Sequence, residues 1–351
     1  MYTLKVVAPH AFILEQTMTE NNDTPHLLQA HLAYGCEARD SIDGSNVTLA
    51  VTLAVTLAVT LAVTLAVTLA VTLVLNPSSR NYRGKDNWKF FLNRGMQEIV
   101  SKSAEYLLDA VITDENDVAV AVGGDGTINL VINGIMKSPM KKKLGVLYSG
   151  TSPDFCKFHA IPTEPEKSIL VLLANRSVPI DIAKLSYDDS GEICYFASSC
   201  NIGIGATIAN ISNKIRKYFG DFLGTCLAAL ISIVRSKPFR AEVIIDGKIV
   251  NFDEVKHIAV MKNNFLASGL HFDLDSKSDD GTLHVIVIKK ISLGTFLNAY
   301  KGKIPPNAYV KKCRMIEIKT TPSQQIEYDG DSYKYTPIKI ECLQKALELI
   351  K

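Results

Sequence analysis

The stretch AVAVGGDGTINLVINGI, Ala119 to Ile135, joins two apolar runs through three glycines and a single acid. The first run belongs to VAVAV, which is continuously apolar, like strands of a parallel sheet that is covered on both faces. The second run, in GTINLVINGIMKS, predicts a helix that is entered directly from the strand. A helix N-terminus offers unpaired N–H groups to an anion, and glycines let a phosphate approach the backbone closely. The stretch therefore predicts a strand, a phosphate-binding turn and a helix.

Asp125 is the unusual member of this turn. The spacing is neither the dinucleotide pattern GxGxxG nor the P-loop pattern GxxxxGK[ST], and the turn has no lysine to meet a phosphate. An acid beside bound phosphates makes sense if it binds Mg²⁺, directly or through water, or orients a nucleotide hydroxyl. Thr127 can cap the helix or bond a phosphate. On these residues alone, a plain glycine turn with an aspartate cap stays open as the structural alternative.

The segments around this stretch alternate between strand and helix. VTLVL predicts a strand over Thr72 to Leu75, which a turn at Asn76-Pro77 ends. WKFFLNRGMQEIVSKSAEYLL (88–108) predicts a helix, and KKKLGVLYSG predicts a further strand. Alternating strands and helices are typical of a doubly wound α/β nucleotide-binding domain, which we expect over residues 71–180.

The pattern changes after about residue 180. Runs such as RAEVIIDGKIVNF and TLHVIVIKK are rich in strand-forming residues, and Asp-Gly pairs at 246–247 and 280–281 predict hairpin turns. One helical stretch, NKIRKYFGDFLGTCLAALISIVRSK, interrupts them. Residues 181–325 are therefore expected to form an antiparallel β-sandwich that takes the substrate. The tail, residues 326–351, predicts a strand and a helical turn or two that return to the first domain.

Composition excludes several classes of function. The 351 residues are 47% hydrophobic and 21% charged, as in a globular protein of two domains. A net charge of +2 gives no sign of a nucleic-acid partner. The seven cysteines form no CxxC pair, which indicates reduced thiols and a cytoplasmic setting and argues against a disulfide or zinc framework.

Two N-terminal segments precede the first domain. Residues 1–46 have no motif to which we can assign a role, and residues 47–70 repeat VTLA without any charge. The uncharged run passes the length rule for a membrane-spanning helix, and its flanks agree with the positive-inside rule. On a strand, a period of four would instead place Val and Leu on one face and Thr and Ala on the other. We favour expansion of a tandem repeat without dedicated function over a membrane anchor.

Three further motifs accompany GGDGT in a fixed order. NPSSR (Asn76 to Arg80) follows the first strand, GTSPDF (Gly150 to Phe155) follows the next helix and strand, and YDGD (Tyr328 to Asp331) comes late. Together they resemble the NPxSG, GGDGT, GTxNDF and DGE motifs of the diacylglycerol kinase catalytic superfamily, which includes sphingosine, ceramide and bacterial lipid kinases. NAD kinases share GGDGT more distantly, but the Asn-Glu motif expected after it in a NAD kinase does not occur in this sequence.

The resemblance implies ATP and Mg²⁺ as cofactors and suggests roles for particular residues. The expected ATP site consists of Asn76, Pro77, Ser78, Ser79, Arg80, Gly123, Gly124, Asp125, Gly126, Thr127, Asn129, Gly150 and Thr151. Asp331 takes the position of the family's glutamate proton acceptor, and Asp329 is the second catalytic candidate. The candidate metal ligands are Asp125, Asp279 and Asp280.

The chemistry of YDGD can be read in two ways. A carboxylate can accept the proton of a lipid hydroxyl while the γ-phosphoryl group transfers, and a second acid two residues away could bind Mg²⁺. As four residues alone, YDGD equally fits a plain hairpin turn.

The implied function is an ATP-dependent lipid kinase, with diacylglycerol as the expected acceptor and phosphatidic acid as the product. Such an enzyme meets its substrate at a membrane surface, and NKIRKYFGDF (213–222) offers basic residues beside aromatic ones for that contact. A partly buried helix with a solvated face is the plainer alternative. We expect a cytoplasmic protein, peripheral at the inner membrane surface, with homodimer formation left open.

Four positions depart from the family's usual pattern. Arg80, Leu130, Pro153 and Asp331 stand where glycine, glutamate, asparagine and glutamate are common. These departures keep two alternatives open, namely a NAD kinase-like small-molecule kinase and a relative that binds nucleotide or lipid without turnover.

Overall fold

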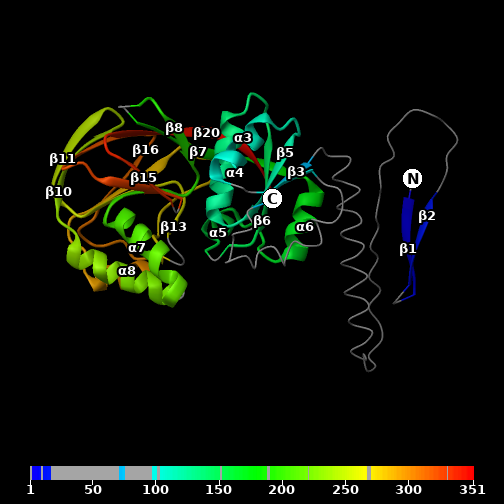
Figure 1. Ribbon diagram of the computed structural model, residues 1–351, viewed down its shortest axis with the longest axis horizontal. Coiled ribbons are helices and arrows are strands. Elements are labelled where there is room, and N and C mark those ends of the chain that lie inside the picture. Colours follow the sequence, from blue (N-terminus) through cyan, green and yellow to red (C-terminus); the bar gives the residue numbers. More distant parts are fainter. Residues whose placement is uncertain are drawn as a thin grey trace, which may run out of the picture. The chain divides into compact units, whose positions relative to one another are not determined.

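The computed structural model describes most of the chain from residue 103 onward (Figure 1). Before residue 103 it describes four short strands. The described ranges are 2–8, 11–16, 71–75, 97–100, 103–150, 152–187, 190–219, 221–266, 270–329 and 331–351. The chain divides into two compact units, Met1–Ala58 and Val59–Lys351. In the first unit, β1 (Tyr2–Ala8) and β2 (Ala11–Gln16) form an antiparallel hairpin.

The repeat at residues 47–70, and with it the membrane-anchor alternative, lies outside the described residues. Among the helices that the structure describes, none combines the length and the apolar character needed to cross a bilayer.

The second unit begins with a parallel sheet. Its strands are β3 (Val71–Leu75), β4 (Gln97–Val100), β5 (Val118–Gly123) and β6 (Lys143–Tyr148), in the spatial order β4-β3-β5-β6. A late strand, β20 (Ile338–Ile350), adds in parallel beside β6. Because β4 and β5 lie on opposite sides of β3, the strand order reverses between β3 and β5. Ligands of open α/β sheets bind at such a switch point, outside the carboxyl ends of the strands.

Helices cover both faces of this sheet. On one face, α3 (Ala104–Thr113) and α4 (Asp125–Lys137) bury Leu107, Val111 and Ile132 against β5 and β6. On the other face, α6 (Pro165–Ala174) packs Ile169 against side chains that alternate with the first set along the same strands. The short helix α5 (Asp154–His159) follows β6. The predicted doubly wound α/β architecture is confirmed.

The remainder of the unit is built from two antiparallel layers. The first layer continues the parallel sheet beyond β20 through β17 (Met315–Thr321), β10 (Phe239–Ile245) and β11 (Lys248–Val255). On its other edge, β20 pairs with β7 (Ser177–Tyr187), which in turn pairs with β8 (Ile193–Phe196). The second layer has the order β16-β15-β12-β9-β18-β19. Its strands are β16 (Tyr309–Cys313), β15 (Leu283–Ile288), β12 (His257–Met261), β9 (Ser199–Gly203), β18 (Gln325–Tyr328) and β19 (Asp331–Tyr335).

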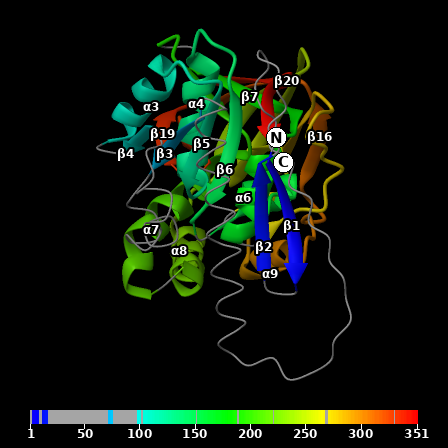
Figure 2. The same cartoon turned by 90° about the vertical axis from the view of Figure 1, so that its right-hand side faces the viewer.

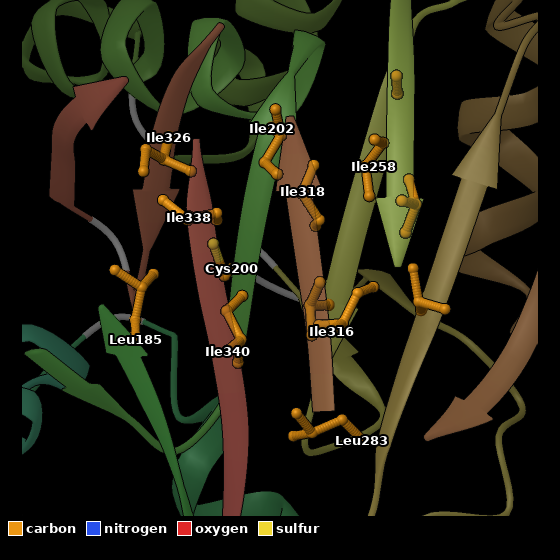
Figure 3. Close-up of a cluster of buried hydrophobic side chains, with 14 of the residues drawn as sticks. Leu185, Cys200, Ile202, Ile258, Leu283, Ile316, Ile318, Ile326, Ile338 and Ile340 are labelled. Carbon is orange, nitrogen blue, oxygen red and sulfur yellow. The ribbon is translucent and has the colours of Figure 1, made fainter. Parts of the chain in front are cut away.

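The two layers enclose a core of aliphatic side chains. Figure 3 shows Ile318 from the first layer next to Ile202 from the second, in the cluster that also contains Ile316, Ile340 and Ile258. The outer face of the second layer is covered by α7 (Ile204–Phe219), α8 (Asp221–Arg235) and α9 (Leu293–Tyr300). Figure 2 shows α7 and α8 side by side. A small hairpin of β13 (Phe265–Leu266) and β14 (Leu270–His271) completes the described elements. The predicted β-sandwich is confirmed.

Three local predictions were wrong. Within the helix expected over 88–108, residues 97–100 form strand β4, because they pair in parallel with β3, and the helix begins only after its cap Ser103. The tail contains the end of β18 and the strands β19 and β20, with no helical turn among its described residues, and KALELI is strand because it pairs with β7 and β6. The one helical stretch expected in the second domain is two helices, the first of which starts at Ile204, and α9 is a further helix that was not expected. In each case tertiary pairing or packing overrides the local pattern.

Candidate active site

The GGDGT turn leaves β5 at the carboxyl edge of the sheet and enters α4 at Asp125. Gly124 is the N-cap residue, and no side chain caps this end of the helix. The main-chain N–H groups of Thr127 and Ile128 both donate to the Gly124 carbonyl oxygen, at 2.9 and 3.0 Å. A Cβ atom at Gly126 would meet nothing within 4 Å. The backbone at Gly126, in the first turn of α4, is therefore open, as the approach of a phosphate to a helix N-terminus requires.

The loops after β5 and β6 approach each other so closely that glycine is required. A Cβ atom on Gly150 would lie 2.6 Å from the Cα atom of Gly124 and 2.5 Å from the Tyr148 hydroxyl. A Cβ atom on Gly123 would lie 2.2 Å from Oγ1 of Thr127, which is buried beneath the turn. The structure thus brings the predicted residues Gly123, Gly124, Gly150 and Thr127 together at one edge of the sheet.

Asp125 is the electrostatic centre of this edge. Its Oδ1 accepts a hydrogen bond from the Phe155 N–H group at 3.4 Å, and its Oδ2 accepts one from the Tyr148 hydroxyl at 3.5 Å. Burial, assisted by the negative charges of Asp154 and Asp329, raises the pKa of Asp125 to about 8. Asp154, within GTSPDF, is the first residue of α5, whereas Asp329 comes from the second domain. Three carboxylates from three separate segments therefore interact here.

YDGD is the hairpin turn between β18 and β19, in which Tyr328 pairs with Asp331. Asp329 has a positive φ of 47°, which an aspartate in such a turn tolerates. Its carboxylate accepts hydrogen bonds from the N–H groups of Ala197, Ser198 and Ser199, at 3.0, 3.1 and 3.1 Å. The hairpin reading is therefore correct for the backbone, and the turn also carries a carboxylate to Asp125.

The other predicted ATP-site residues fall into two groups. Asn129 is buried, and its main-chain and side-chain oxygens both accept hydrogen bonds from Asn133. Its side chain is therefore bonded within α4. Residues 76–80 and Thr151 lie outside the described residues, although β3 ends at Leu75, directly before the first of them. For Asp331 the structure describes the backbone, as the first residue of β19.

Asp279 and Asp280 have lysine partners. The two carboxylate oxygens of Asp280 lie 3.1 Å from Nζ of Lys262 and 2.9 Å from Nζ of Lys312, and Asp279 lies 3.8 Å from Nζ of Lys345. Partial burial opposes ionisation of Asp280, but hydrogen bonds from Lys312 and Lys262 lower its pKa well below the usual range. This arrangement departs from the expected metal site, because ammonium groups already neutralise the carboxylates.

No group of three or more His, Cys, Asp or Glu side chains in the described part of the chain is arranged to hold a metal ion. Mg²⁺, however, is usually bound through one or two carboxylates together with substrate phosphates and water. The interacting acids Asp125 and Asp154 fit such a donor set, because burial and the charge of Asp154 raise the pKa of Asp125 and a bound cation would offset both effects.

Two contributors were absent from the residues that the sequence singled out. Asp154 lies within the quoted motif GTSPDF, so its place in that motif was the available signal. The turn at Ala197–Ser199 binds the Asp329 carboxylate through main-chain N–H groups. Almost every residue type has such a group, so the residue types at 197–199 carried no signal for this role.

Comparison with known proteins identifies the family. Residues 70–185 match the diacylglycerol kinase catalytic domain, and residues 198–351 match the YegS C-terminal NAD kinase beta sandwich-like domain. Diacylglycerol kinases of Staphylococcus aureus strains bovine RF122 / ET3-1 and MRSA252 are each 24% identical over 299 residues, which cover 79% of this chain and 90% of the relative. The chain belongs to the diacylglycerol kinase catalytic-domain family and is a kinase.

Solved structures agree on the fold. A crystal structure from Bacillus anthracis str. Sterne superposes with a TM-score of 0.65 at 21% identity, covering 80% of this chain and 95% of that chain. A diacylglycerol kinase structure from the same organism gives a TM-score of 0.60 at 20% identity, covering 80% and 96%. Both matches extend over the α/β domain and the sandwich together, since they cover four fifths of the chain.

Proposed function

We propose that this kinase transfers the γ-phosphoryl group of ATP to the hydroxyl of a lipid, with diacylglycerol as acceptor and phosphatidic acid as product. The observation that carries the proposal is the meeting of the uncapped N-terminus of α4 with carboxylates from both domains. The relatives named diacylglycerol kinase support the lipid acceptor.

In this proposal the N-terminus of α4 receives the ATP phosphates. The open backbone at Gly126 lets phosphate oxygens approach N–H groups, and the helix dipole favours their negative charge. Asp125 and Asp154 would hold Mg²⁺, which neutralises charge on the phosphates when bound. Gly150 keeps the loop after β6 free of a side chain where that loop meets the turn.

The acceptor side of the reaction is assigned to the YDGD hairpin. The Asp329 carboxylate accepts hydrogen bonds from three main-chain N–H groups, which fix the hairpin in place. Asp331, at the other side of the two-residue turn, is then the proton acceptor for the lipid hydroxyl. Asp331 carries this carboxylate on a side chain one methylene shorter than the glutamate that is common at this position.

A lipid substrate requires contact with a membrane surface, for which α8 offers a face. Leu227, Leu230 and Val234 are 36%, 48% and 78% exposed and recur at helical spacing along one side. Basic residues flank them, with Arg235 at the end of α8 and Lys237 shortly after it. We assign membrane contact to this face. Co-sedimentation with anionic phosphatidylglycerol vesicles tests the assignment. Leu230→Glu is expected to weaken binding of the protein to these vesicles.

Transfer of ³²P from labelled ATP to vesicles containing diacylglycerol, sphingosine or ceramide tests the function itself. The expected result is labelled phosphatidic acid, formed only with added Mg²⁺. NAD is included as a soluble acceptor. Labelling of NAD with no labelling of any lipid would replace the proposal with a NAD kinase activity, and labelling of no acceptor would favour a binding protein without turnover.

The raised pKa of Asp125 leads to a pH-dependent requirement for Mg²⁺. Below about pH 8 the carboxyl is mostly protonated, so a proton competes with the metal. The Mg²⁺ concentration for half-maximal activity should therefore fall as pH rises from 6 to 8, by up to about tenfold per unit, and then level off. Titrations of Mg²⁺ at fixed pH measure it. Asp125→Asn should lose this dependence, and a flat profile in the wild type would contradict the assignment.

A further inference from the structure

Asn133 lies on α4, about two turns beyond Asp125, and its side chain contacts the strand β8. Its Nδ2 donates to the carbonyl oxygen of Tyr195 at 2.7 Å, and its Oδ1 accepts from the Tyr195 N–H group at 2.9 Å. The carboxamide thus bonds to both main-chain groups of one strand residue, much as a neighbouring strand would. Nδ2 also donates to both oxygens of Asn129, at 2.9 Å each, which fixes the orientation of the amide.

The strand that receives Asn133 leads directly to the active site. β8 has four residues and pairs with β7 along one edge, so Asn133 bonds to its other edge. Tyr195 precedes by two residues the turn of Ala197, Ser198 and Ser199. The three N–H groups of that turn hold the carboxylate of Asp329. An unbroken series of hydrogen bonds and short chain segments therefore runs from α4 to the YDGD hairpin.

We infer that Asn133 is a positioning residue, which sets the distance between the nucleotide side of the site on α4 and the acceptor side on the YDGD hairpin. Its carboxamide fixes β8 against α4, and β8 in turn fixes the turn that holds Asp329. The two ends of this connection belong to different domains, and a buried side-chain amide with both its oxygen and its nitrogen bonded is stiff. The catalytic part of the inference rests on the proposed function.

The expected consequence of losing this connection follows from the geometry of phosphoryl transfer. A displacement of about 1 Å between reacting groups can lower the rate of the chemical step by about 100-fold. Binding of ATP depends on the first turn of α4 and the neighbouring loops, whereas the hydrogen bonds of the Asn133 side chain go to Asn129 and Tyr195. Loss of Asn133 should therefore lower kcat and leave the KM for ATP nearly unchanged.

Hydrogen exchange tests whether Asn133 fixes the turn at residues 197–199, without any assay of activity. In Asn133→Ala, the amides of Ala197, Ser198 and Ser199 should exchange at least about tenfold faster than in the wild type at the same pH and temperature. The matched control is Asn116→Ala, because the Asn116 amide donates to Thr72 at 2.6 Å and to Asp114 at 3.2 Å, both within the first domain. In this control, exchange at residues 197–199 should stay at the wild-type rate.

Steady-state kinetics test whether the connection through Asn133 affects the rate of phosphoryl transfer, at a temperature at which both variants are folded. Asn133→Ala should lower kcat by about 10- to 100-fold with the KM for ATP within about twofold, whereas Asn116→Ala should change neither. Asn133→Asp provides a second variant of the same size. It keeps an oxygen for the Tyr195 N–H group but replaces the donor to the Tyr195 carbonyl with an acceptor, and it should show the same loss.

The possible outcomes separate the two proposals. Unchanged exchange at residues 197–199 in both Asn133 variants would overturn the inference, as would equal acceleration in Asn116→Ala. Failure of both Asn133 variants to fold would also overturn it, because the residue would then serve folding alone. If the wild type phosphorylates no lipid, the proposed function fails, but faster exchange confined to the Asn133 variants would still support the connection.

Discussion

Replacing Asp331 with asparagine is expected to lower kcat for lipid phosphorylation by about 100- to 10,000-fold and to leave the melting temperature close to that of the wild type. An amide of the same size cannot accept the proton of the acceptor hydroxyl. Asp331 is the first residue of β19, at the end of a two-residue turn, where asparagine fits the backbone equally well. Initial rates with diacylglycerol vesicles, together with a thermal melt, measure both effects.

The neighbouring Asp329→Asn variant provides the contrast. Its carboxylate accepts three main-chain hydrogen bonds, and an amide would point an N–H group at one of those donors. We therefore expect Asp329→Asn to lower both the activity and the melting temperature. Near wild-type activity in Asp331→Asn would exclude Asp331 as the proton acceptor, and a stable but inactive Asp329→Asn would move that role to Asp329.

Replacing Lys262 with methionine is expected to lower the free energy of unfolding by about 3–5 kcal/mol. The Lys262 ammonium lies 2.7 Å from Oδ2 of Asp181 and 3.1 Å from Oδ1 of Asp280, and it donates to the carbonyl oxygens of Lys277 and Thr282 at 2.8 and 3.1 Å. The side chains of Lys262 and Asp181 are 2% and 0% exposed. Removal of the cation leaves a buried carboxylate without its counter-charge, which is the costly way to break such a pair.

An exposed ion pair in the same protein supplies the control. Lys339 and Glu317 are 3.1 Å apart, with side chains 41% and 40% exposed, so Lys339→Met should cost about 0–1 kcal/mol. Urea unfolding of both variants gives the comparison. Adding Asp181→Asn to Lys262→Met should recover part of the loss, because it removes the uncompensated charge. Equal, small effects in the two lysine variants would contradict the prediction.

The phosphate-binding part of the fold could be predicted from the sequence because its causes are local. An apolar strand, glycines at a sharp turn and a helix with an apolar face are all encoded within Ala119–Ile135, and β5 and α4 fall there. The contact between this turn and Gly150 is a matter of loop geometry, but both partners were named by their motifs.

Other elements depend on partners far away in the chain. QEIV at 97–100 is a strand because β3 lies beside it, and KALELI near the end is a strand because β7 and β6 enclose it. A local pattern contains no record of these neighbours. The ion pair between Lys262 and Asp280 could not be predicted for a similar reason. The two residues are 18 positions apart, and nothing in the sequence around Lys262 marks it as buried.

Strand β20 affects how the protein acquires its structure. It pairs with β17 and β7 in its first half, and with β6 and β7 near its end, so one strand joins the antiparallel part of the sheet to its parallel part. The nucleotide-binding sheet thus lacks its fifth parallel strand until the whole sandwich sequence has left the ribosome. Pairing across such sequence separations is slow, and the unprotected edge of β6 is exposed meanwhile. The two domains are therefore expected to mature as one cooperative unit late in synthesis, without an independently folded first half.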